Sequence, residues 1–165
     1  VGRGRNEGEH EEWEENGQQE MGKKMTTAAV TNHGATFDAI RASNEGTGGG
    51  AIQALLEEGL EGKVEVTGQD ADLGACQRID AGTQAMGIYK PIKNLANRVA
   101  ELAVAMARGT PIIVRKGVPN NQVEVPSVMS EVIVVTKDNL RETVIADGFH
   151  AEEDVYRNVS DRDGK

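Results

Sequence analysis

Three polar residues follow three short apolar runs, and together they could bind a small polar ligand. Asn44 comes after FDAIRAS, Asp70 after KVEVTGQ and Lys90 after TQAMGIY. Each run is typical of a short strand, and each polar residue comes where that strand would end. Ligands of open parallel α/β sheets bind at the carboxyl ends of the strands, so we expect these three side chains to meet at one rim.

The hydrogen-bonding groups of these side chains complement one another. The amide of Asn44 donates and accepts, the carboxylate of Asp70 only accepts, and the ammonium of Lys90 only donates. Such a set suits the hydroxyls of a small neutral polyol, and bonds to charged groups are roughly twice as strong as neutral ones. Each residue also has a plainer interpretation. Asn and Asp often cap helices, and a lone Lys is usually solvated.

The segments between these residues predict the α/β class, with an open parallel sheet flanked by helices. Residues 45–60 form an amphipathic helical pattern, and Asp72 stands where the N-cap of the next helix belongs. Pro91 then precedes the longest helical pattern, which Gly109 closes. Because strand and helix alternate from residue 36 on, the sheet should be parallel. The apolar stripe of the longest helix needs a partner surface; it consists of Ile92, Leu95, Val99, Leu102 and Met106.

Two features of the first fifty residues allow more than one interpretation. Trp13 could stack on a sugar ring or anchor a helix that runs from near Trp13 to about residue 32, and its position favours the anchor. The glycine-rich run 46–50 could approach a phosphate at a helix N-terminus. It matches no nucleotide-binding motif, so close packing of the helix on the sheet is the better interpretation.

Composition excludes several partners. The 165 residues carry 18 Lys+Arg against 27 Asp+Glu, a net charge of -9, so we expect no nucleic-acid partner and no docking on an anionic membrane. The first twenty residues contain no signal-peptide core. The single Cys76 is expected to be a buried free thiol.

No catalytic or metal-binding set emerges from the sequence, so we expect neither enzymatic activity nor a cofactor or metal. His10, His33 and His150 have no nucleophile or orienting group at motif spacing, and we expect all three at the surface.

The motifs ASN, GQDAD, AGTQ, YKP and DGFH, in this order, resemble the C-terminal half of the D-xylose-binding proteins, a family of type I periplasmic sugar-binding proteins of ABC importers. The resemblance covers residues 36–157. By that resemblance Asn44, Asp70 and Lys90 match sugar-contacting residues, and Trp13 is a weaker counterpart of a family aromatic. Glu45 stands where the family usually has Asp, and Arg41 replaces an apolar strand residue.

The resemblance also implies a domain organisation. Residues 1–35 form an acidic segment that matches the family poorly and could be part helix, 36–157 form the C-terminal half of a two-lobed fold, and 158–165 are a charged tail. In the family, helix 91–109 belongs to the other lobe. We therefore interpret the chain as a fragment or truncated relative, whose stripe on that helix is exposed or covered by the missing N-terminal lobe or by another chain.

The resemblance implies a substrate-binding component of an ABC sugar transporter. It would bind D-xylose or a similar aldose in the periplasm or outside the cell and deliver it to a membrane permease. One alternative is the effector-binding core of a lac-repressor-type regulator, but residues 1–35 are acidic and supply no DNA-binding headpiece. A structural fragment that binds no ligand is the other.

Overall fold

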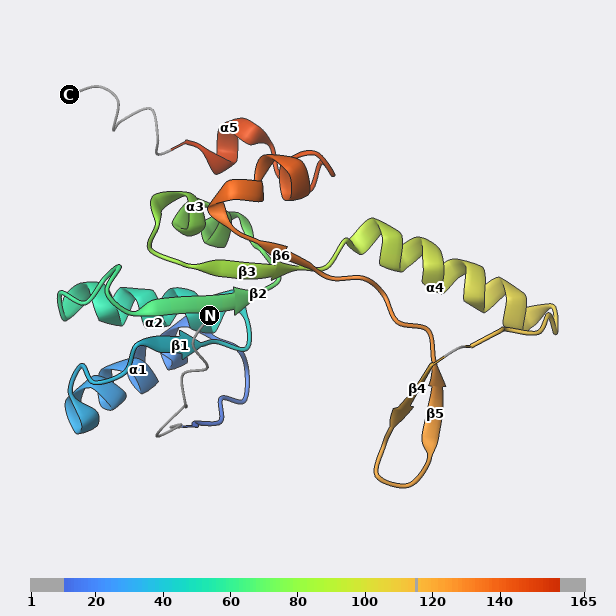
Figure 1. Ribbon diagram of the computed structural model, residues 1–165, viewed down its shortest axis with the longest axis horizontal. Coiled ribbons are helices and arrows are strands. Elements are labelled where there is room, and N and C mark those ends of the chain that lie inside the picture. The colour runs from blue at the N-terminus through green and yellow to red at the C-terminus, as the bar shows by residue number, and fades with distance from the viewer. Residues whose placement is uncertain (1–10, 115, 158–165) are drawn as a thin grey trace, which may run out of the picture.

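A small mixed sheet with helices packed on it forms the body of the molecule, and one helix and one hairpin extend away from this body (Figure 1). The structure, a computed structural model, describes residues 11–114 and 116–157. The predicted charged tail, 158–165, and His10 lie outside the described residues. The helices are α1 Gln19–His33, α2 Glu45–Glu57, α3 Leu73–Ala81, α4 Ile92–Ala107 and α5 Glu152–Val155, with short helical segments at η1 Lys137–Asn139 and η2 Arg141–Ile145.

Three of the strands form the predicted parallel arrangement. β1 (Ala39–Arg41) pairs with β2 (Glu65–Gln69), and β2 pairs with β3 (Met86–Tyr89), all in parallel. β6 (Ile133–Val135) then joins β3 in the antiparallel direction, so the order is β1-β2-β3-β6 and the sheet is mixed at one edge. The parallel α/β prediction is confirmed for the three strands whose ends carry Asn44, Asp70 and Lys90.

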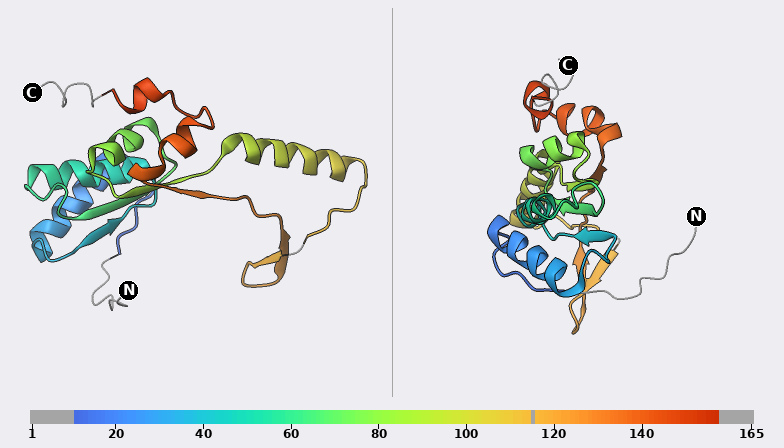
Figure 2. Two further views of the ribbon diagram at one scale, coloured as in Figure 1. Left: turned by 45° about the horizontal axis from the view of Figure 1, so that its top comes forward. Right: turned by 90° about the vertical axis from the view of Figure 1, so that its left-hand side faces the viewer.

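Helices α2 and α3 lie along one face of this sheet, and α1 packs against α2 (Figure 2). Buried positions alternate along β2 and β3, so the helix-covered face is the dry one. The core has two parts. One joins α2 to β2 around Leu55 and Val66, and the other joins α3, β3 and the C-terminal segments around Ile79, Tyr89 and Val144.

The glycine-rich run serves close packing, as predicted, although its main partner is a helix and not only the sheet. A Cβ on Gly50 would lie 2.0 Å from the carbonyl oxygen of Gln19 in α1, and one on Gly22 would lie 2.3 Å from the carbonyl oxygen of Thr47 in α2. Gly46 meets the Gly17 carbonyl in the same way. Glycine is required here because the two helix backbones approach within the space of a methyl group.

The start of α1 and the exposure of Arg41 differ from expectation. α1 begins at Gln19, six residues after Trp13, and ends as predicted at Gly34, whose N–H bonds the Val30 carbonyl. Arg41 is exposed, because β1 is an edge strand of the described sheet and its side chain reaches solvent. An arginine at this position therefore carries no burial cost.

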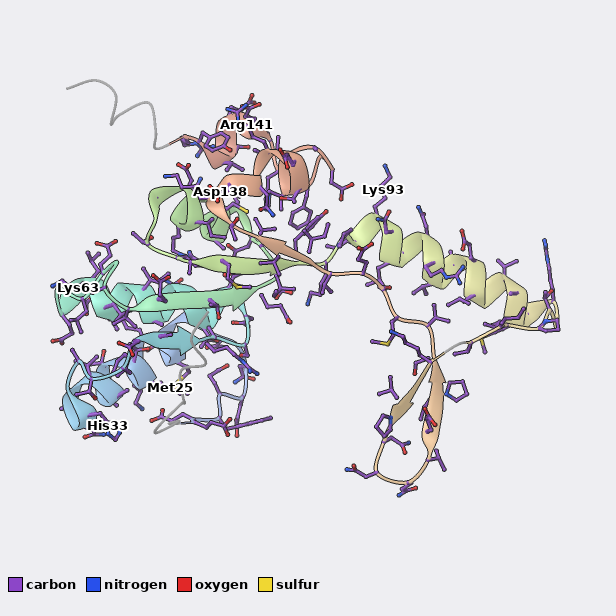
Figure 3. All side chains as sticks on the ribbon, in the orientation of Figure 1. Met25, His33, Lys63, Lys93, Asp138 and Arg141 are labelled. Carbon is purple, nitrogen blue, oxygen red and sulfur yellow. The ribbon has the colours of Figure 1, made fainter. Side chains whose placement is uncertain are left out.

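Helix α4 and the hairpin of β4 (Lys116–Pro119) and β5 (Glu124–Ser127) lie apart from the sheet in Figure 1 and in the left-hand view of Figure 2. None of the residues of α4 is buried. Lys93, in its first turn, points into open space (Figure 3). The apolar stripe is exposed as the sequence predicts, with Ile92 58%, Val99 57% and Met106 70% accessible.

Candidate functional site

Asp70 and Lys90 form an ion pair at the carboxyl ends of neighbouring strands. The two residues directly follow β2 and β3, whose parallel register pairs Gln69 with Ile88, and the Asp70 N–H bonds the Ile88 carbonyl at 2.8 Å. The Lys90 Nζ lies 2.5 Å from Asp70 Oδ1. The side chains are 42% exposed for Lys90 and 49% for Asp70, so an acceptor and a donor stand together within reach of a ligand.

Asn44 stands at the end of β1 and caps α2. Its Oδ1 accepts the backbone N–H and the hydroxyl of Thr47, both at 2.8 Å, and its Nδ2 donates to the Gly17 carbonyl at 3.1 Å. Asn44 therefore caps a helix, as its plainer interpretation expects. Capping does not exclude ligand contact: Oδ1 already accepts two hydrogen bonds, but Nδ2 has donated only one of its two N–H groups and keeps the other for a ligand.

Trp13 is the remaining candidate that the sequence named. The side chain of Trp13 is 91% exposed and lies outside α1, so it anchors no helix. An open depression of about 620 Å³ lies along α4, beside Asn97 and Val104, and not at the strand ends.

Sequence reasoning missed the role of Glu45, which follows Asn44 and is only 3% exposed. Its Oε2 accepts from Gln84 Nε2 at 2.7 Å and lies 3.8 Å from Arg78 Nη2, while its Oε1 accepts the Ala71 N–H at 3.3 Å. Burial raises the pKa of this carboxyl, and the donors of Gln84 and Ala71 oppose that rise. One side chain thus connects the start of α2 with α3 and with the residues before β3.

The space for this carboxylate comes from two glycines in the sheet. Gly68 in β2 and Gly87 in β3 are partners in the parallel register. A Cβ on Gly68 would lie 2.1 Å from Glu45 Oε2, and one on Gly87 would lie 2.6 Å from Oε1. Glycine has no side chain, so two glycines on neighbouring strands indicate that another residue fills the layer between helix and sheet.

His150 was expected at the surface; it is partly buried, and the sequence did not predict its contacts. Its Nε2 lies 2.8 Å from the carbonyl oxygen of Ala71, and its ring packs on Phe149 with the centroids 4.4 Å apart. A carbonyl can only accept, so Nε2 carries the proton. The DGFH motif, residues 147–150, is therefore tied to the residue after Asp70. His33 is exposed, as expected.

The same motif also holds the end of β3. The buried Tyr89 donates its hydroxyl to Asp147 Oδ2, and its ring lies 4.9 Å from that of Phe149. Burial, then the bond to Asp147, raises the pKa of Tyr89 to about 12. Cys76 is buried as predicted, and burial raises the pKa of its thiol to about 12. Both groups are neutral at physiological pH and serve as structural parts.

Comparison with known proteins follows this geometry. The D-xylose-binding periplasmic protein of Escherichia coli (strain K12) is 44% identical over 145 residues, and that of Haemophilus influenzae is 42% identical over 146 residues. Each alignment covers 88% of this chain and 44% of the relative, so the chain spans less than half the length of these curated relatives.

A solved structure shares the arrangement of elements. The carbohydrate transporter solute binding protein of Chloroflexus aurantiacus, solved in complex with D-glucose, superposes with a TM-score of 0.75 at 28% identity, over 82% of this chain and 41% of that chain. Within the described part of the chain, no helix has the length and apolar character needed to cross a membrane. These relatives are sugar-binding transport proteins and not enzymes.

The family match agrees with the structural likeness and with the order of motifs in the sequence. Residues 6–111, about two thirds of the chain, match the periplasmic binding protein domain, and the matched part includes α1 and the segment before it. The chain belongs to the periplasmic binding protein domain family.

Proposed function

We propose that this chain is the sugar-binding part of the substrate-binding component of an ABC sugar transporter, with D-xylose or a similar aldose as its ligand. The observation that carries the proposal is the ion pair of Asp70 and Lys90 at adjacent strand ends, 2.5 Å apart and half exposed. The two D-xylose-binding relatives above support the choice of sugar. Delivery to a membrane permease, in the periplasm, follows from the family.

The ion pair suits two neighbouring hydroxyls of one sugar ring. One hydroxyl would donate to the carboxylate of Asp70 while the next accepts from the ammonium of Lys90, so each charged group keeps a partner when the sugar enters. Without sugar, the two groups neutralise each other. Asn44 would add an amide from the third strand end, using the capacity that capping leaves. Trp13, which is exposed in the segment before α1, would contribute a stacking surface.

A second lobe completes this proposal. No residue of α4 is buried, and the relatives are more than twice as long as the part that this chain matches. We propose that an N-terminal lobe, or another chain, covers the apolar stripe of α4 and encloses the sugar from the other side. Enclosure matters because an exposed hydrogen bond contributes only ~0.5 to 1.5 kcal/mol net, or ~1.5 to 3 when charged.

Isothermal titration calorimetry with D-xylose, D-glucose and D-ribose tests the proposal. Three or four half-exposed hydrogen bonds must offset an association cost of ~4 kcal/mol or more, so the chain alone should bind D-xylose no more tightly than roughly millimolar. Joined to the N-terminal lobe of the Escherichia coli relative, it should bind at least ~100-fold more tightly, and Asp70→Ala or Lys90→Met should remove that gain.

Glu61→Gln is the matched control, because it removes an exposed carboxylate outside the strand ends. A joined protein that binds none of the three sugars would overturn the proposal in favour of a fragment that binds no ligand. Micromolar binding by the isolated chain, abolished by Asp70→Ala, would instead show that the half-site is stronger than this reasoning allows.

A further inference from the structure

Each proposed sugar contact is the chain neighbour of a residue in a buried network. Asn44 precedes Glu45, Asp70 precedes Ala71, and Lys90 follows Tyr89. These three neighbours are 3%, 0% and 1% exposed, whereas the proposed contacts themselves are accessible. The buried neighbours Glu45, Ala71 and Tyr89 therefore position the three proposed contacts.

The backbone beside Asp70 adopts an unusual conformation. The φ angles are +105° at Asp70 and +51° at Ala71, and among the described residues Asn121 is the only other non-glycine with positive φ. Side chains with a Cβ disfavour this region, since the Cβ crowds the neighbouring carbonyl. Two such residues in succession persist only where the surrounding contacts require them.

Both polar groups of Ala71 have such contacts. Its N–H donates to Glu45 Oε1 at 3.3 Å, and its carbonyl accepts from His150 Nε2 at 2.8 Å and from the thiol of Cys76 at 3.5 Å. Glu45 comes from the start of α2 and His150 from the C-terminal segment, so two separate parts of the chain hold the two peptide units that flank the Cα of Ala71.

We propose that Glu45 and His150 are positioning residues, which hold the Asp70–Ala71 turn in its positive-φ conformation and thereby aim the Asp70 carboxylate at Lys90 and at a bound sugar. Neither residue contacts the sugar in this scheme. The predicted effect on sugar binding rests on the proposed function. The hydrogen bonds of Glu45 and His150 to Ala71, here called the clamp on Ala71, do not depend on it.

The neighbours of Glu45 present a hydrogen-bond donor to each of its two carboxyl oxygens. Gln84 donates its Nε2 to Glu45 and to the Met86 carbonyl at 3.1 Å, while its Oε1 accepts from Arg78 Nε at 3.0 Å, so its amide cannot turn over without losing all three bonds. A glutamine at position 45 would present its NH₂ either to the NH₂ of Gln84 or to the N–H of Ala71. One donor would face another in both orientations.

The test uses the full 165-residue chain and nuclear magnetic resonance. The three-bond couplings between amide and α protons report φ at Asp70 and Ala71, amide exchange reports the clamp on Ala71, and titration with D-xylose up to high millimolar concentration reports binding. For Glu45→Gln and His150→Ala we expect couplings shifted towards averaged values, Ala71 exchange faster by about tenfold and D-xylose affinity weaker by about tenfold.

Two further variants separate positioning from general stability. His150→Gln keeps an N–H donor for the Ala71 carbonyl and should stay within about twofold of the unmodified chain in affinity and exchange. Val64→Ala truncates a buried residue of the α2–β2 core, so it should lower the unfolding midpoint and leave the couplings and the affinity unchanged.

Unchanged couplings and affinity in folded Glu45→Gln and His150→Ala would overturn the inference, as would an equal loss of affinity in Val64→Ala. A loss in His150→Gln as large as in His150→Ala would remove His150 from it. If the unmodified chain shows no response to D-xylose even after addition of the second lobe, the proposed function fails, while the couplings and the Ala71 exchange still decide whether the clamp exists.

Discussion

Helix α4 has a regular apolar pattern and is exposed, whereas helix α2 has a weaker pattern and is buried. α4 has the more regular apolar stripe, from Ile92 to Met106, yet none of its residues is buried. α2 carries glycines at four of its first six positions, and eight of its residues are buried. The difference shows that periodicity identifies the face that a helix would bury, while the rest of the chain decides whether anything is present to cover it.

The backbone explains why α2 succeeds without a strong stripe. Its glycines let α1 approach on one side and let the sheet and Arg78 approach on another, so the backbone itself is part of the contact. α4 has bulky apolar side chains instead, which suit a partner surface of larger area. The following predictions test this contrast, beginning with the largest expected effect.

Leucine truncation should separate the two helices most clearly. Leu55 in α2 is 1% exposed and Leu95 in α4 is 42% exposed. Leu55→Ala should cost about 3 kcal/mol of unfolding free energy, because it leaves a cavity in the core, and Leu95→Ala should cost about 0.5 kcal/mol or less. Urea unfolding followed by circular dichroism measures both. Equal costs would mean that α4 is covered in solution.

Hydrogen exchange should show the same contrast in the backbone. Amides in the middle of α4 open without disturbing any core, whereas those of α2 and β2 open only with the sheet. We expect exchange at Val99 to be at least about 100-fold faster than at Leu55. After α4 is covered by a second lobe, this difference should shrink. Slow exchange in the isolated α4 would contradict the view that its face is uncovered.

Glycine substitution tests the close approach of α1 and α2. A Cβ at position 50 would lie 2.0 Å from a main-chain carbonyl oxygen, so Gly50→Ala should cost about 1 to 3 kcal/mol through separation of the helices. Gly74→Ala in α3 is the control. Its Cβ would meet the movable guanidinium of Arg78 at 3.2 Å, so it should stay within about 1 kcal/mol of the unmodified chain in thermal unfolding.

The smallest expected effect is the pH dependence that Glu45 contributes. Its pKa is raised in the folded state by burial, with Asp72 adding to the rise while Gln84, Ala71 and Arg78 oppose it. Its contribution to stability is therefore fully present below the ordinary glutamate pKa of about 4.3 and is lost as the pH rises through the folded pKa. Relative to Glu45→Gln, the unmodified chain should be most stable at acidic pH. A difference in unfolding free energy that does not vary between pH 3 and 8 would contradict this.

The strand and helix pattern could be predicted well where local signals were strong. Asp72 caps α3, Gly34 ends α1, and α4 occupies the predicted residues up to the turn at Gly109. The antiparallel pairing of β6 with β3 could not be predicted, because more than forty residues separate them and nothing local encodes such a contact. The start of α1 was placed six residues early, because Trp13 was taken as part of its apolar face.

For the candidate site too, some contacts could be predicted from the sequence and others could not. The contact of Asp70 with Lys90 followed from strand ends and parallel pairing, which sequence periodicity reports. The supporting network did not, because Glu45, Gln84 and His150 are polar residues whose burial depends on partners far along the chain. Only the glycines at 68 and 87 hinted at it. The roles of Asn44, Asp70 and Lys90 towards a sugar remain predictions.

The pair of glycines beneath Glu45 places a constraint on how this protein can change over evolution. The carboxylate fills the volume of two missing Cβ atoms, so positions 45, 68 and 87 cannot vary independently. A side chain at 68 or 87 is tolerable only alongside a shorter residue at 45, and the order of substitution matters, since the shortening has to come first. Relatives of this chain should therefore show the three positions changing together. Their covariation would record the close contact between one helix start and two strands.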